Sequence, residues 1–224
     1  MRKTAKMMEE AANVLKLLSS AQNRRDQGPN EKLAEQIASE EDHNAVKVLV
    51  AHLADKSKDI RNDCIKVLYE IGERNPSLIA TYASDFLPLL KSKGNRMQWG
   101  AMTAIYSLTP ARPEWVYEVL PEILEAAELG SVITKDNAVK ILISLCAHKE
   151  YANNCFDLLN EQLLKSAVNQ LPMYAEKALS VINEKNKSTF IKSLHSRLAD
   201  IDKESKRKRI EGVLRKVQKL FPDS

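Results

Sequence analysis

The sequence predicts an all-α fold built from helical hairpins that repeat along the chain. First, one pattern of apolar residues returns every 37 residues over most of the 224-residue chain. Second, the apolar residues of each copy are spaced i, i+3, i+4 and i+7, which places them on one face of a helix. Third, helix-forming residues dominate, the chain holds only 6 Gly and 8 Pro, and no segment alternates as a β-strand does.

The repeat is clearest in the segment that we expect to be the second helix of each hairpin. Its copies read "DCIKVLYEI" (63–71), "GAMTAIYSL" (100–108), "NAVKILISL" (137–145) and "YAEKALSVI" (174–182), and "IEGVLRKV" (210–217) follows at a spacing of 35. Equivalent positions form one column of small residues, namely Cys64, Ala101, Ala138 and Ala175. Three further columns are mostly larger and apolar: Val67, Ala104, Ile141 and Ala178; Leu68, Ile105, Leu142 and Leu179; Ile71, Leu108, Leu145 and Ile182. A constant period in this range is typical of stacked two-helix repeats.

An amphipathic segment precedes each copy and is expected to form the first helix of the hairpin. These segments are residues 43–55, 77–92, 114–128, 151–166 and 186–200. Pro88 and Pro121 fall at similar places inside two of them. Because Pro removes a backbone hydrogen bond, we expect those helices to bend there.

The stretch "DKSKDIRNDCIKVLYEI" (55–71) carries a turn with Asp, then Ile60-Arg61, then Val67-Leu68. In this order of residues the chain resembles the HEAT-repeat (HEAT/armadillo-like) family of α-solenoids. The resemblance covers roughly residues 43–220. It implies a right-handed α-α superhelix of about five HEAT-like hairpins.

The N-terminal part does not follow the repeat, and we expect residues 1–42 to form capping helices. Apolar residues mark one amphipathic helix at Met7, Met8, Ala11, Leu15 and Leu18, and a short one at Leu33, Ala34 and Ile37. A solenoid must cover the apolar side of its first repeat. We therefore expect a cap over 1–42 and a solenoid over 43–224, in one continuous domain.

Motifs for catalysis or cofactor binding are absent from the sequence. It contains no GxGxxG, Walker or HExxH motif, and no CxxC pair. The four histidines, His43, His52, His148 and His195, lack the spacing of metal ligands. Of the three cysteines, Cys64 is expected in the core, whereas Cys146 and Cys155 flank one loop, as buried thiols or with a ligand or redox role. We expect no enzyme activity, catalytic residue, metal or cofactor.

Hydropathy, the N-terminal charges and the cysteine count together suggest where the protein is located. No apolar run approaches the roughly 20 residues that span a bilayer. Glu9 and Glu10 stand where a signal peptide needs an apolar core, and the odd cysteine count fits a reducing environment. We therefore expect a cytoplasmic protein with no membrane span.

The second helices of HEAT-type stacks line the concave side, so we expect the residues opposite the buried face to bind a partner. The columns there are Asn62, Trp99, Asp136 and Met173; Lys66, Thr103, Lys140 and Lys177; Tyr69, Tyr106, Ile143 and Ser180; and, at the flank, Ile65, Met102, Val139 and Glu176. We expect Trp99 and Tyr106 to be anchors, with Tyr69 and Met102 beside them, because aromatic residues and Met are enriched at interfaces. Lys66, Lys140 and Lys177 would then favour an acidic partner. In the alternative interpretation the apolar residues pack between adjacent helices and the lysines form a solvated face.

The C-terminal segment is strongly basic. Residues 203–219 hold 8 basic and 2 acidic side chains, a local charge of +6 in a chain of net charge +4. Three interpretations remain open: a solvated capping helix, a membrane-surface helix, or a contact to an acidic partner or nucleic acid through Lys206, Arg207, Lys208 and Arg209.

Two functions follow as hypotheses. The first is a non-enzymatic scaffold or adaptor that binds an acidic or amphipathic segment of a protein partner in its concave groove. The alternative is a nucleic-acid-binding HEAT-like protein, similar to the DNA alkylation-repair glycosylases, that uses the basic helix and the groove lysines. As we know that family, it places a Trp and an Asp one helical turn apart. Here Trp99 is followed by Thr103 and Trp115 by Val119, neither of which is a carboxylate.

Overall fold

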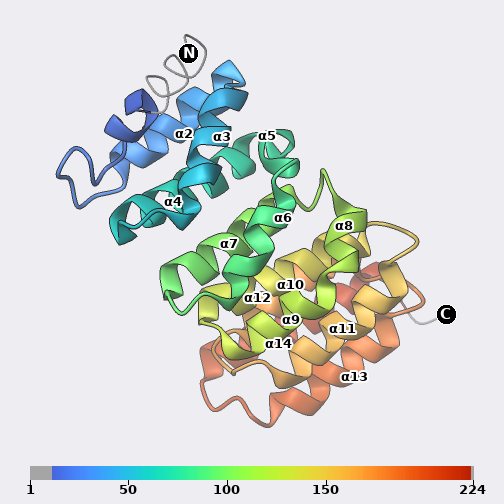
Figure 1. The fold of residues 1–224 in the computed structure, drawn as a ribbon. Helices are drawn as coiled ribbons and strands as arrows, with labels where there is room; N and C mark the ends of the chain where they lie inside the picture. Colours follow the sequence, from blue (N-terminus) through green and yellow to red (C-terminus); the bar gives the residue numbers. More distant parts are fainter. Residues whose placement is uncertain (1–11, 223–224) are drawn as a thin grey trace. The chain divides into compact units, whose positions relative to one another are not determined.

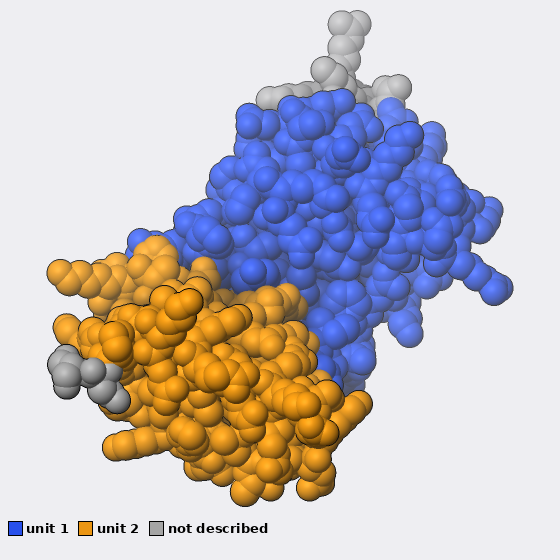
Figure 2. All heavy atoms as spheres, turned by 180° about the vertical axis from the view of Figure 1, so that it is seen from behind, with its two compact units in different colours: residues 1–135 blue, residues 136–224 orange. Residues whose placement is uncertain are grey.

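The structure is a computed structural model that describes residues 12–222. None of these residues forms a β-strand, and α-helices with short 3-10 helices account for the regular structure. The all-α prediction is confirmed. The chain divides into two compact units, Met1–Lys135 and Asp136–Ser224, which we describe separately (Figure 2).

Unit 1 is organised around one long helix, α4 (Lys58–Arg74), which packs against α2, α3, α5 and α7 (Figure 1). Its other elements are α2 (Gly28–Glu40), α3 (His43–Ala51), η1 (His52–Ala54), α5 (Pro76–Ala80), α6 (Ala83–Phe86), η2 (Leu87–Lys91), α7 (Asn95–Leu108), α8 (Pro113–Glu118) and α9 (Leu120–Leu129). Helix α10 (Val132–Cys146) begins in unit 1 and ends in unit 2. Side chains cap the N-termini of two of these helices. Asp42 accepts a hydrogen bond from the Ala45 amide at 2.9 Å at the start of α3, and Ser57 accepts one from the Ile60 amide at 3.4 Å at the start of α4.

Unit 2 stacks hairpin on hairpin. Its elements after α10 are α11 (Ala152–Lys165), α12 (Leu171–Ala178), η3 (Leu179–Val181), α13 (Lys187–Leu198) and α14 (Glu204–Leu220). Helix α11 packs on α13 and α12 packs on α14, while α11 with α12 and α13 with α14 form the hairpins. First helices therefore stack on first helices and second on second, as a repeat array requires.

The predicted core columns are buried. Cys64, Ala101, Ala138 and Ala175 are at most 1% exposed, and Ile210, Val213, Leu214 and Val217 of the last copy are at most 6% exposed. Of the larger columns only Leu179 is half-buried, because the second helix of its copy changes to the 3-10 helix η3 at this residue. The period of 37 thus identified the packing faces of the second helices.

The prediction of bent helices at Pro88 and Pro121 is wrong, because the chain starts a new helix at each place. Each Pro is the second residue of a new helix, η2 or α9, and no continuous helix runs through it. A backbone N–H in the first turn has no partner within its helix, so Pro costs little there. The chain therefore breaks its first helices into short pieces.

Helices α4 and α7 run parallel and touch closely. A Cβ on Gly100 would lie 2.8 Å from Cγ1 of Ile65, and a Cβ on Gly72 would collide with the Ser107 hydroxyl. Both contacts join residues 35 positions apart, so the two helices advance in the same direction. Glycine at both places lets the second helices of successive repeats approach.

The N-terminal cap is fastened to α4 by a buried polar cluster. Asp63, 5% exposed, accepts from the Ser20 amide at 2.8 Å and from Nδ2 of Asn30 at 2.7 Å. Asn30 is itself fully buried and accepts from the Ser19 amide at 2.9 Å. The short helix expected at Leu33 is confirmed as α2.

Two expectations about the N-terminal region have different outcomes. Of the first predicted cap helix, residues 12–16 are helical and Leu18 is fully buried, whereas Met7, Met8 and Ala11 lie outside the described residues. The predicted boundary between residues 42 and 43 stays a prediction.

The described part of the chain contains no helix both long and apolar enough to cross a membrane.

Candidate functional site

The strongest candidate site in unit 1 is an aromatic pair on α4 and α7. The rings of Tyr69 and Trp99 are 5.7 Å apart between centroids and tilted by 51°, a favourable arrangement for two aromatic rings. The close approach at Gly100 brings α7 near enough for this contact. Tyr69 is only 8% exposed, while Trp99 is half-buried. Tyr106, two turns beyond Trp99 on the same helix, is also half-buried.

Lys66 does not offer a free charge beside this pair. Its side chain is 9% exposed, and its Nζ lies 2.5 Å from Glu70 and 3.2 Å from Glu31. The same ammonium lies 5.0 Å from the centre of the Tyr69 ring, a cation–π contact. The expectation that Lys66 steers an acidic partner is therefore wrong, because α2 supplies a carboxylate that neutralises it.

The charges of this cluster stabilise one another. Burial raises the pKa of Glu70, but hydrogen bonds from Lys66 and Arg74 outweigh it, so the pKa lies below its usual value. Burial likewise lowers the pKa of Lys66, and its bonds to Glu70 and Glu31 reverse that effect, so the pKa is raised. Both groups are therefore ionised at neutral pH.

Met102 and two other residues of the flank column belong to the core, whereas Glu176 is exposed and pairs with Arg209. Met102 and Ile65 are fully buried and Val139 is 1% exposed. Thr103 is 8% exposed, and its hydroxyl donates to the Trp99 carbonyl at 2.8 Å. Met102 as an anchor is a wrong prediction, and the alternative of packing between helices describes it. Ile65 lies against Gly100 of the neighbouring second helix, so this part of the flank does not face solvent.

Unit 2 holds the rest of the predicted surface. Asp136 accepts from the Tyr174 hydroxyl at 2.7 Å, and burial together with this bond raises the pKa of Tyr174. Lys140 donates to Asn137 Oδ1 at 3.0 Å. Met173 is half-buried and Lys177 is exposed. The structure thus gathers Asn62, Lys66, Tyr69, Trp99, Met102 and Tyr106 in unit 1 and Asp136, Lys140, Met173 and Lys177 in unit 2.

The basic C-terminal helix is tied into unit 2. Arg209 forms two hydrogen bonds with the Glu176 carboxylate, at 2.8 and 2.7 Å, and Arg207 donates to the Ile201 carbonyl at 2.8 Å. Lys208 pairs with Glu204 at 2.6 Å, and Lys206 donates to Asn169. All four basic residues predicted as contacts therefore have intramolecular partners. The apolar face of α14 is buried, which fits the interpretation as a capping helix.

The three thiols are poorly suited to nucleophilic chemistry. Burial raises the pKa of Cys64 and of Cys146 to about 12 and that of Cys155 to about 11. The thiolate is the reactive form, so little of it exists at neutral pH. Within residues 12–222, no group of three or more His, Cys, Asp or Glu side chains could hold a metal ion.

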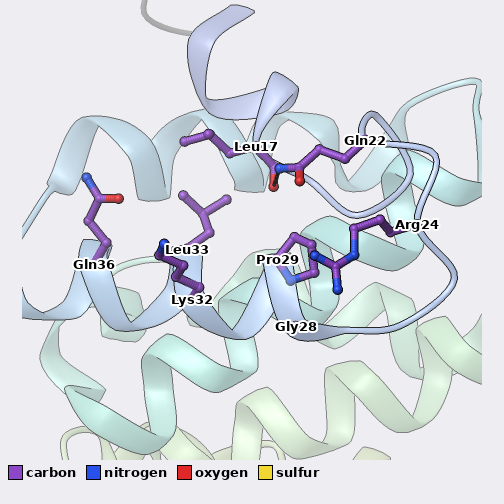
Figure 3. A pocket seen from close by; sticks show the side chains of 8 residues that line it. All are labelled: Leu17, Gln22, Arg24, Gly28, Pro29, Lys32, Leu33 and Gln36. Atoms are coloured by element: carbon purple, nitrogen blue, oxygen red, sulfur yellow. Dashed lines mark hydrogen bonds between the residues drawn. The ribbon is translucent and has the colours of Figure 1, made fainter.

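A pocket in the N-terminal cap was not anticipated from the sequence. It lies between residues 17–24 and the first turns of α2 and has a volume of about 370 Å³ (Figure 3). Its apolar wall consists of Leu17, Pro29 and Leu33, and its polar rim of Gln22, Arg24, Lys32 and Gln36. We call it the cap pocket. Helical spacing places 29 with 33 and 32 with 36, but nothing in the sequence indicates that residues 17–24 fold back over them.

Comparison with solved structures identifies the fold. A designed armadillo repeat protein in complex with the peptide (KR)4 superposes with a TM-score of 0.62 at 16% identity, over 83% of this chain and 85% of that one. Computationally designed armadillo repeat proteins for modular peptide recognition superpose with a TM-score of 0.60 at 18% identity, over 91% and 98%. The fold is thus a helical repeat solenoid of the HEAT/armadillo kind, as predicted. No protein-family model and no curated protein matches the chain.

Proposed function

We propose that this protein is a non-enzymatic scaffold that binds a segment of a protein partner through the surface around Trp99 and Tyr106. The observation that carries the proposal is the half-buried Trp99, whose ring contacts that of Tyr69. A large aromatic side chain fixed before binding loses little conformational entropy when a partner covers it. Trp and Tyr are also the residues most enriched among those that dominate binding energy.

The fold supports this role. Armadillo-type stacks present extended surfaces, and the designed neighbours described above are peptide-recognition proteins by name. The structure refines the expected partner. Since Lys66 is neutralised by Glu31 and Glu70, the surface near Trp99 carries no isolated positive charge from it. An amphipathic segment with an apolar anchor residue fits this surface better than a purely acidic one.

Nucleic-acid binding is not proposed. Its support was the basic C-terminal helix, and Lys206, Arg207, Lys208 and Arg209 are all engaged within unit 2. The residues four positions after Trp99 and Trp115 are Thr103 and Val119, neither of which is a carboxylate. We therefore keep the scaffold as the single proposed function.

The test compares two tryptophan variants. A partner captured from the native host and then purified is titrated by calorimetry against the wild-type chain, Trp99→Ala and Trp115→Ala. We expect Trp99→Ala to weaken binding by at least about tenfold, the range of an interface anchor. Trp115, half-buried on α8, is the matched control and should change binding little.

Thermal unfolding of the same variants separates binding from packing. If Trp99→Ala lowers the melting temperature while partner affinity is unchanged, Trp99 is a packing residue and the proposed site is wrong.

A further inference from the structure

The cap pocket has the size of a binding site and an incompletely covered apolar wall. Its volume of about 370 Å³ lies within the range of roughly 300–1,000 Å³ seen for ligand sites. Leu17 remains 45% exposed although it lines a concavity together with Pro29 and Leu33. In Figure 3, Leu17 comes from the segment above α2 and Leu33 from the helix beneath it. Pro29 and Leu33 are already buried, so an occupant with an apolar side chain would cover Leu17, the exposed member of the wall.

The rim of the pocket is cationic. None of the described residues that line it is acidic, whereas two of them, Arg24 and Lys32, are basic. Arg24 is held by Asp26, at 2.9 Å from Nε to Oδ2, so its charge is largely offset. Lys32 is exposed, and no residue between 12 and 222 forms an ion pair with it. The free charge at the pocket is therefore that of Lys32, which a carboxylate would complement.

The polar groups of the rim suit a peptide backbone. The side-chain amides of Gln22 and Gln36 can each donate to a carbonyl and accept from an N–H. Both have intramolecular partners at present: Gln22 donates to the Leu17 carbonyl at 2.9 Å and Gln36 to Glu40 at 3.2 Å. No aromatic side chain is among the described residues of the lining, so the pocket offers no platform on which a nucleobase could stack.

The cap pocket is separate from the surface around Trp99. At 100° per residue, Lys32 and Gln36 face one side of α2, whereas Gln27 and Glu31 face away from them. Gln27 accepts from Arg96 at 2.7 Å and Glu31 pairs with Lys66, so that other side of α2 is turned toward α4 and α7. Variants in one site therefore leave the side chains of the other in place.

From these observations we infer that the cap pocket is a second protein-binding site. It takes an aliphatic side chain flanked by Asp or Glu, from an acidic segment of a protein partner. The aliphatic side chain covers Leu17 and the carboxylate pairs with Lys32. This site extends the proposed scaffold role to a second surface and does not depend on Trp99.

The experiment uses blocked peptides and the full chain labelled for NMR. The probes are the acetylated, amidated peptides Gly-Glu-Leu-Asp-Gly, Gly-Lys-Leu-Lys-Gly and Gly-Glu-Gly-Asp-Gly. We expect the first to shift the signals of Leu17, Lys32 and Leu33 with a dissociation constant of about a millimolar, the range of a single small contact. The second and third should bind at least about fivefold more weakly, because each lacks one half of the complementary pair.

Charge reversal makes the test specific. Lys32→Glu should weaken the acidic leucine peptide at least about fivefold and strengthen the lysine peptide. Lys47→Glu, on the exposed face of α3, is the matched control and should change neither. Leu17→Ser should remove the preference for leucine over glycine, and it is tolerated because Leu17 is not in the core.

Three outcomes would overturn the inference. One is equal binding of the acidic and basic leucine peptides. Another is an unchanged titration with Lys32→Glu. The third is a shift of the Leu17, Lys32 and Leu33 signals with protein concentration alone, which would show that a second copy of the chain fills the pocket. Since Trp99→Ala leaves this pocket intact, failure here is distinguishable from failure of the proposed function.

Discussion

At the scale of single residues, several charges that the sequence placed on a binding surface have partners within the chain. Lys66 illustrates this: it lies on a predicted binding column, yet Glu31 and Glu70 surround its ammonium. Burying a charge is unfavourable unless a partner compensates it, so such clusters fail when one member is removed. Glu70, whose side chain is 14% exposed, is the member that also binds Arg74.

Glu70→Gln should therefore change the pH dependence of stability. The folded-state pKa of Glu70 lies below its usual value of 4.5, so its contribution is complete above that pH. The contribution is lost as the pH falls from about 4.5 through the folded-state pKa. We expect the variant to be about 2 kcal/mol less stable than the wild type at pH 7, and this difference to shrink below pH 4.5.

Urea unfolding at pH 7, 5, 4 and 3 measures this difference. Glu161→Gln, which removes an exposed pair with Lys165, is the control and should show almost no effect at any pH. If the difference in unfolding free energy between wild type and Glu70→Gln stays constant across this pH range, the ionised Glu70 carboxylate is not the source of the stability.

Residue-level prediction from the sequence succeeded where one helix determines the answer. Cys64 and Ala101 are buried as their columns indicated, because the buried face follows from the spacing within a helix. It failed for Met102, which other helices bury, and for Lys66, because one of its two carboxylates comes from α2. Glu31 precedes Lys66 by 35 residues in a segment outside the repeat, so no periodicity could place it.

At the scale of elements, glycine sets how closely α4 and α7 pack. Gly100 and Gly212 make a natural comparison, since both lie inside second helices. A Cβ at Gly100 would press on Ile65 at 2.8 Å, whereas one at Gly212 would meet only the end of the Arg215 side chain at 3.8 Å. The same substitution should therefore have opposite effects at the two sites.

We expect Gly100→Ala to destabilise the protein by about 1–2 kcal/mol, because overpacking outweighs the gain in helix propensity. Gly212→Ala should stabilise it by about 0.5–1 kcal/mol, since the alanine enters open space and restricts the unfolded chain. The shift of the urea midpoint measures both. A change in the same direction at both positions would show that helix propensity alone decides.

The order and type of the elements could be predicted, but their internal breaks could not. The segments expected as first helices at 77–92 and 114–128 are each divided, at Tyr82 and Leu87 in one and at Val119 in the other. Amphipathic spacing continues across such breaks because the short pieces still bury one face. Pattern alone therefore overestimates the length of a helix.

At the scale of the whole molecule, the distribution of free charge argues for a protein partner over nucleic acid. Arg215, Lys216 and Lys219 remain exposed on α14, but Lys208 and Arg209 of the neighbouring basic cluster form ion pairs. Affinity for nucleic acid depends on how many phosphates free cations can neutralise, and it falls with salt. The ion pairs of Lys208 and Arg209 leave fewer free cations on α14 for this purpose.

We therefore expect the full chain to give no gel shift of duplex or single-stranded DNA at about 150 mM salt. Weak retardation at about 20 mM salt should disappear in a triple variant in which Arg215, Lys216 and Lys219 are changed to Glu. A shift that persists at the higher salt would restore the nucleic-acid alternative.

The bond between Gln27 and Arg96 has a consequence for how this protein is made. The two residues are 69 positions apart, and the bond, 2.7 Å long, joins the start of α2 to the first turn of α7. Most contacts of a repeat array form between neighbours and can be made as the chain is synthesised. This contact must wait until α7 has emerged from the ribosome. Residues 27–40, although translated before α7, thus complete their hydrogen bonds only after the second hairpin has been made.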